Sequence, residues 1–220
     1  MSSMKIRISK DEGNKLMGRS VDVVVGNQQE PFSVHENLVR TSSRFFDKAM
    51  AGKWRESLQR TVKLPDEEPN IFTLYLHWLY YGALPVYCDK PGLAGNSEYL
   101  ELAKAYVLGD KLLDSKFQDT VIDAIIEKSL SKAKDGASWY PVGEVIEYVY
   151  CNTHESAPIR ELLVDMYVYY GYSDWLRDYN EPENVPQPFL LKLASKLLDR
   201  RVKSGVSLEA ERYHSHGSNE

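Results

Sequence analysis

Short apolar runs separated by turn residues mark the first third of the chain. The run 21–25, in which four of five residues are valine, is typical of a strand buried in a sheet. Gly26 and Asn27 directly after it favour a tight turn, and a helical pattern begins after His35. The predicted elements are strands at 21–25, 30–34 and 61–64, a helix at 36–42 and a second helix centred on 44–46. This order predicts a hairpin covered by helices, with a third strand returning to it.

The stretch 70–81 is too apolar on all sides to be a surface helix. Its large apolar residues are Ile71, Phe72, Tyr75, Leu76, Trp78 and Leu79. Pro69 suits the first position of this helix, and Gly82 suits its end. We therefore expect a central helix here. The following segment, 83–87, is predicted as an edge strand, because Pro85 cannot donate a ladder hydrogen bond.

The second half of the chain is predicted to contain helices only. They are expected at 97–113, 117–130, 142–150, 159–170 and 189–200. Ser115 and Gln118 have the spacing of a capping box. The helix 117–130 carries two apolar stripes, and the second consists of Ile122, Ile126 and Leu130. Because leaving this second stripe exposed to water would cost free energy, we expect the C-terminal helices to dock on it.

The fold class that follows is α+β. A small sheet of the strands 21–25, 30–34, 61–64 and 83–87 is wrapped by helices and followed by a helical C-terminal extension. We divide the chain into an N-terminal segment 1–18, a mixed domain 19–130, an extension 131–202 packed on that domain, and a tail 203–220. The tail has almost no apolar residues and is expected to be disordered.

Composition mainly excludes classes of partner. The chain has 220 residues and a formal net charge of -5, without the basic stripe that nucleic-acid binding requires. No apolar run approaches the length of a membrane span, and the N-terminus lacks an apolar signal core. Cys88 and Cys151 are expected to be buried thiols in a reducing compartment rather than a disulfide. We expect an intracellular protein, cytoplasmic, nuclear or both, that binds neither nucleic acid nor membrane.

Motifs for catalysis or for cofactor binding are missing from the sequence. It contains no glycine-rich phosphate loop and no Gly-x-Ser-x-Gly. His214 and His216 have metal-like spacing, but two ligands on a floppy tail cannot enforce a tetrahedral site. His77, within the apolar helix, is interpreted as a core or near-core histidine. The sequence therefore predicts no enzyme, no cofactor and no metal site.

Taken in order, these residues resemble the BTB/POZ family. The matching runs are 21–26, 32–35, 38–39, 43–46, 62–64, 79–82, 102–103 and 111–112. The resemblance covers roughly 19–130. A helix with the pattern Tyr-Val-Leu-x-x-Lys-Leu, here 106–112, together with a helical extension, is similar to BTB proteins of filamentous fungi. The resemblance implies a protein-binding module that self-associates or ties a substrate to a cullin ubiquitin ligase.

In ligase-adaptor members, the loop after the second helix carries a hydrophobic-x-Glu motif. Its apolar residue enters a pocket on the cullin, and Trp54 and Glu56 stand at the two motif positions here. An exposed tryptophan beside an acid is a plausible anchor, since it supplies a large contact area at low entropic cost. The alternative is that Trp54 folds back over its own helix. Tyr80 matches a position that contacts the cullin in adaptor members, and its alternative is core packing.

In transcription-factor members, a buried aspartate on the first strand faces a basic residue in a charged pocket at the dimer interface. Asp22 matches the aspartate, but Glu36 stands at the basic position. Two facing carboxylates would repel each other, or the pKa of one of the two carboxyl groups would rise. The resemblance therefore does not imply that this chain forms the charged-pocket dimer. On this argument Glu36→Arg would strengthen dimerisation. The alternative for Asp22 is a hydrogen-bonded structural acid near a turn.

The leading functional interpretation is protein–protein interaction, most concretely as a substrate adaptor of a cullin-based E3 ubiquitin ligase. The alternative is a homotypic or heterotypic scaffold, for example in gene regulation, without a ligase role. The expected partners are proteins, with a cullin and a second copy of the chain as candidates. Substrate recruitment would fall to residues 142–200 of the extension or to a partner.

Overall fold

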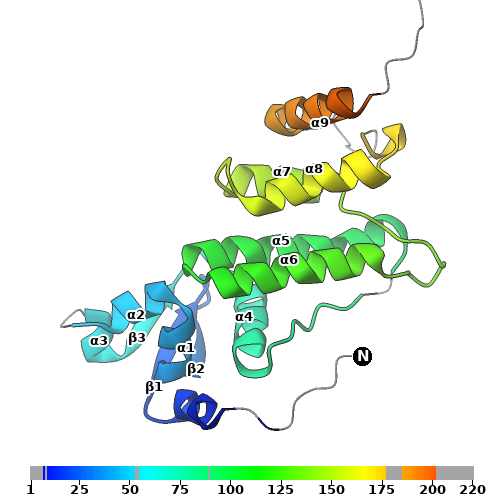
Figure 1. Cartoon of the computed structure of the whole chain (residues 1–220). Helices are drawn as coiled ribbons and strands as arrows, with labels where there is room; N and C mark the ends of the chain where they lie inside the picture. The colour runs from blue at the N-terminus through cyan, green and yellow to red at the C-terminus, as the bar shows by residue number, and fades with distance from the viewer. Residues whose placement is uncertain (1–6, 8, 53–54, 89, 177–184, 202–220) are drawn as a thin grey trace, which may run out of the picture.

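The computed structural model describes residues 7, 9–52, 55–88, 90–176 and 185–201 (Figure 1). Its strands are β1 (Ser20–Val25), β2 (Glu30–His35) and β3 (Thr61–Leu64). They form one sheet in the order β2-β1-β3, with β1 antiparallel to β2 and parallel to β3. Val23 lies opposite Phe32 on one side and Val62 on the other, so these side chains share the core face. The three predicted strands are confirmed, as is the α+β class.

The predicted strand at 83–87 is wrong. This segment is extended but pairs with none of the three strands of the described sheet. Pro85 has no N–H to donate, and contacts to helices hold the segment instead. The Ala83 carbonyl oxygen lies 2.7 Å from His77 Nδ1, and the Cys88 N–H donates to Glu98 Oε2 at 2.8 Å.

Helices make up most of the described chain. The α-helices are α1 (Glu36–Ser42), α2 (Arg44–Met50), α3 (Arg55–Gln59), α4 (Pro69–Tyr81), α5 (Asn96–Lys111), α6 (Ser115–Leu130), α7 (Glu144–Asn152), α8 (Pro158–Tyr170) and α9 (Gln187–Arg200). Short 3-10 turns cover Lys10–Leu16, Gly92–Gly95 and Ser173–Leu176. α4 is central, as predicted, with Phe72 and Tyr75 fully buried. It begins at Pro69 and ends where Gly82 adopts a left-handed conformation at φ 68°.

α7 and α8 lie in a second layer over α5 and α6, and α9 lies beyond them (Figure 1). α7 packs mainly on α5, and its Val145, Ile146 and Val149 are buried there. Ile126 and Leu130 of α6 are 38% and 66% exposed, so the expected docking of the extension is wrong for these two residues of the stripe. Ile122, the third, is half-buried and lies beside residues 153–158 between α7 and α8. α5 has buried residues on nearly every side, which makes it the helix shared by both layers.

Aromatic rings hold the extension together. Tyr140 stacks on Tyr170 and on Trp175, with centroid distances of 5.0 Å to each. Phe189 of α9 meets Tyr150 at 5.7 Å and Tyr167 at 5.0 Å, both edge to face. These ring contacts belong to one hydrophobic core that runs continuously from the sheet through α5 into the extension.

Both cysteines are free thiols. Cys88 is half-buried, but Cys151 is exposed, so the expectation of two buried thiols is wrong for Cys151. Among the residues that the structure describes, no helix is long and apolar enough to cross a membrane.

Candidate functional site

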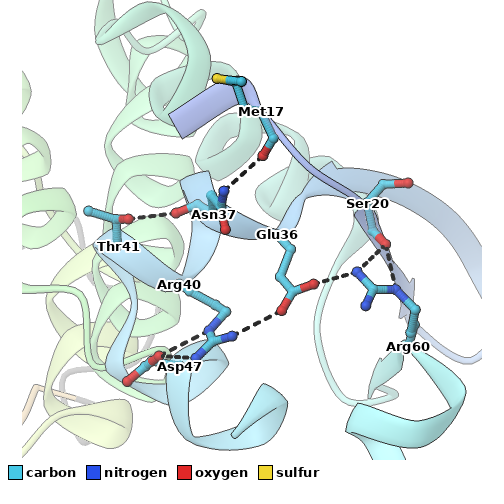
Figure 2. Close-up of polar contacts among 8 residues, drawn as sticks. All are labelled: Met17, Ser20, Glu36, Asn37, Arg40, Thr41, Asp47 and Arg60. Atoms are coloured by element: carbon cyan, nitrogen blue, oxygen red, sulfur yellow. Dashed lines mark hydrogen bonds and ion pairs between the residues drawn. The ribbon is translucent and has the colours of Figure 1, made fainter. Parts of the chain in front are cut away.

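Glu36, the first residue of α1, lies between two arginines (Figure 2). Arg40, one turn along α1, donates from Nη1 to Glu36 Oε1 at 3.0 Å. Arg60 precedes β3, and its Nη2 donates to Glu36 Oε2. The same guanidinium donates to the Ser20 carbonyl oxygen, from Nε at 3.2 Å and from Nη2 at 3.1 Å. The carboxylate thus ties the start of α1 to the segment leading into β3.

A second acid completes this set. Arg40 donates from Nε at 3.0 Å and from Nη2 at 2.9 Å to Asp47 Oδ1 on α2. We call Glu36, Arg40, Asp47 and Arg60 the Glu36 network. It contains two carboxylates and two guanidinium groups, so its charges compensate one another within the chain.

The pKa of Glu36 reflects these partners. Burial by itself would raise the pKa of the carboxyl group, but the hydrogen bonds and charges of Arg60 and Arg40 outweigh it and hold the pKa below its ordinary value. Glu36 is therefore an ionised, paired carboxylate in the chain as it folds.

Asp22 lies on the outer face of β1, between Ser33 of β2 and Thr61 of β3. Its side chain is exposed and makes no hydrogen bond or ion pair with any residue in the described part of the chain. Its backbone N–H donates to the Arg60 carbonyl oxygen at 3.0 Å. Asp22 is therefore not the hydrogen-bonded structural acid of the alternative interpretation.

Glu36 is not the unpaired carboxylate that the like-charge reasoning for the charged-pocket dimer requires. Arg40 and Arg60 of the same chain already hold it. Glu36→Arg would place a third guanidinium beside these two. We now expect this substitution to lower stability through like-charge repulsion, rather than to strengthen dimerisation.

The hydrophobic-x-Glu motif falls partly outside the described residues, because Trp54 is not among them. Glu56 lies on α3, a five-residue helix where a plain loop was expected, and it is exposed. It borders a hollow of about 760 Å³ between α2, α3 and β3. The apolar side chains lining that hollow are Phe45, Ala49, Ala51, Val62 and Leu113.

Tyr80 is partly exposed, and its hydroxyl group is hydrogen-bonded. It is 37% exposed, near the end of α4. Its hydroxyl oxygen accepts from the His35 N–H at 3.2 Å and lies 2.8 Å from His35 Nδ1. Tyr80 therefore anchors α4 to the junction of β2 and α1 while leaving part of its ring accessible.

Asp114 is a buried polar residue that the sequence analysis missed. It is the N-cap of α6, and its Oδ1 accepts from the Phe117 N–H at 3.1 Å, so the predicted capping box is wrong. Its Oδ2 accepts from the Tyr75 hydroxyl at 3.0 Å and from the Ser42 hydroxyl. We call these four residues the Asp114 cluster. Burial, together with the Asp114 charge, raises the pKa of the Tyr75 hydroxyl, so that hydroxyl remains a hydrogen-bond donor.

A buried ion pair was missed as well. Lys128 Nζ of α6 lies 2.8 Å from Glu98 Oε2 of α5, and the two side chains are 9% and 7% exposed. Glu98 also accepts from the Cys88 N–H, and Lys128 lies 5.0 Å from the centre of the Tyr99 ring. The pair joins three segments and is structural.

No group of three or more potential metal ligands occurs among the described residues. His214 and His216 lie outside them.

Residues 14–115 match the family model of the BTB/POZ domain. This part of the chain is a BTB/POZ domain. Such domains are protein–protein interaction modules and are generally not enzymes. No curated protein matches the chain, so the narrower resemblance to fungal members stays a prediction.

Proposed function

We propose that the chain is a substrate adaptor of a cullin-based E3 ubiquitin ligase. The BTB/POZ domain would bind the cullin, and the helical extension, or a partner held by it, would bind the substrate. The observation that supports this most is the exposed Glu56 beside the hollow of about 760 Å³. In adaptor members this acid follows the apolar residue that enters the cullin.

The surroundings of Glu56 suit such a contact. α3 is a short helix between α2 and β3, and Leu58 on it is 74% exposed. Exposed apolar side chains next to an acid supply both contact area and a polar rim, the usual anatomy of an interface. Tyr80, with its partly exposed ring, offers a further contact.

The test is binding of the full chain to the N-terminal domain of a cullin, measured by calorimetry and by size exclusion with light scattering. We expect a complex. Trp54→Ala should weaken it by about thirtyfold or more, which is the roughly 2 kcal/mol of an interface hot spot. Glu56→Ala should weaken it less and leave the melting temperature unchanged, because an exposed acid contributes little to folding.

Trp139→Ala is the matched control. Trp139 is 40% exposed and lies in the extension, away from α3, so its removal should leave cullin binding intact. A large fall in melting temperature for Trp54→Ala would indicate a core tryptophan. That result, or a chain that does not bind the cullin domain at all, would remove the adaptor proposal and leave the scaffold alternative.

A further inference from the structure

α9 is the outermost helix of the described chain and is covered on one side only (Figure 1). Phe189 and Leu193 bury their side chains against the rest of the extension. Lys196 pairs with Glu161 and Asp165 on α8. These contacts fix which side of α9 faces the molecule.

The apolar surface of α9 extends well beyond this covered side. Leu190, Leu191, Leu197 and Leu198 are 38%, 68%, 47% and 64% exposed. Ala194 between them is exposed as well. At about 3.6 residues per turn, these five residues form one stripe along the helix with no charged side chain in it. We call them the leucine stripe.

The leucine stripe is symmetric about Ala194. Leu190 and Leu198 stand four residues before and after it, and Leu191 and Leu197 stand three residues before and after it. If two α9 helices lie antiparallel across a two-fold axis at Ala194, each leucine therefore meets a leucine of the other copy. A two-fold interface requires this self-complementarity, and an alanine at the crossing point lets the two helices approach closely.

The charges of α9 agree with this arrangement. Lys192 and Lys196 repeat the same symmetry, two residues either side of Ala194, but both pair with Glu161 of their own chain. Two copies would thus bring apolar surfaces together without facing unpaired lysines. We infer that the leucine stripe of α9 is a self-association surface that binds a second copy of this chain in antiparallel orientation.

This surface is separate from the BTB/POZ domain and independent of the proposed cullin contact. Four leucines and an alanine can bury less surface than the roughly 800 Å² per partner of a standard interface. We therefore expect a weak dimer, with a dissociation constant in about the micromolar range.

Sedimentation of the full chain over a range from about 1 to about 500 μM tests this. We expect the mean mass to rise from monomer toward dimer. Leu191→Lys and Leu198→Lys should each weaken dimerisation at least tenfold without lowering the melting temperature, because both side chains are largely exposed. Leu93→Lys is the control, since Leu93 is 64% exposed but lies outside α9, and it should leave the dimer unchanged.

Disulfide trapping tests the orientation. In a Cys151→Ser background, which removes the exposed native thiol, Ala194→Cys should form a dimer under mild oxidation because it lies on the axis. Gln187→Cys, about 10 Å along the helix from the axis, should not. Efficient trapping at both positions would indicate parallel helices and overturn the antiparallel assignment.

Three other results would overturn the proposal. A chain that stays monomeric over the whole range has no such surface. A dimer that persists in Leu191→Lys and Leu198→Lys uses another surface. A fall in melting temperature in both variants, without a change in mass, would mean that a segment of the same chain covers the stripe.

Discussion

The Asp114 cluster and the Glu36 network both centre on one carboxylate in the BTB/POZ domain, yet their surroundings differ. Asp114 is 1% exposed and accepts from two hydroxyl groups and a backbone N–H. Glu36 has a side chain that is 16% exposed, and its partners Arg40 and Arg60 are 34% and 31% exposed. The Asp114 carboxylate therefore accepts hydrogen bonds from neutral donors away from water. The Glu36 carboxylate accepts them from two cations near the surface.

The difference indicates which polar groups maintain the fold and which are available to partners. Donors left unpaired in the core cannot turn to water, so each lost partner costs about 1–3 kcal/mol. Arginines at the surface regain hydration when their partner is removed, and such pairs contribute about 0–1 kcal/mol. The Glu36 network can thus exchange partners at an interface at small cost, whereas the Asp114 cluster cannot.

The largest effect is expected for Asp114→Ala. It leaves the Tyr75 hydroxyl, the Ser42 hydroxyl and the Phe117 N–H without their acceptor, and Tyr75 is fully buried. We expect a loss of about 4 kcal/mol of unfolding free energy, measured by chemical denaturation. Asp119→Ala, at an exposed position on the same helix, should change stability by less than about 0.5 kcal/mol. Equal effects of the two substitutions would contradict the comparison.

A smaller effect is expected for Lys128→Ala. It leaves the Glu98 carboxylate in a site where its side chain is only 7% exposed, with the Cys88 N–H as a remaining donor. Removing one member of a buried ion pair costs about 3 kcal/mol. Lys116→Ala, at an exposed position of α6, is the matched control and should have little effect.

The double variant Glu98→Gln/Lys128→Met sharpens this test. The amide oxygen that replaces the Glu98 carboxylate can still accept from the Cys88 N–H, and no buried charge is left unpaired. The double variant should therefore melt above Lys128→Ala. If it is the less stable of the two, the ion pair itself, rather than the unpaired acid, carries the stability.

The sequence was informative where the signal is local. The valine run of β1 and the apolar helix α4 were located from spacing alone, with their ends at Gly26 and Gly82. Asp114 also left a local signal, since an aspartate before Ser115 and three residues before Phe117 is a typical N-cap. The spacing of Ser115 and Gln118, which also fits a capping box, competes with that signal.

The partners of Glu36 left no local signal. Arg40 is four residues away, but Arg60 is 24 residues away and reaches Glu36 only because β3 lies beside β1. The resemblance identified the position of Glu36 but not what surrounds it. The strand prediction for 83–87 was wrong for a related reason, because this segment is held by tertiary contacts to His77 and Glu98 rather than by the sheet.

The smallest effect is expected for the Glu36 network and depends on pH. Because Arg60 and Arg40 hold the folded pKa of Glu36 below its ordinary value of 4.5, the unfolded chain takes up the proton first as the pH falls. The stabilisation from Glu36 is therefore complete above about pH 5 and is lost as the pH falls below 4.5 through the folded pKa. Glu36→Gln should cost at most about 1 kcal/mol at pH 7, and the difference from the wild type should shrink toward pH 3. Melting temperatures of both proteins from pH 7 to pH 3 measure it. A difference that is the same at both ends would show that the two arginines do not stabilise the charged carboxylate, and the contrast with Asp114 would then rest on burial alone.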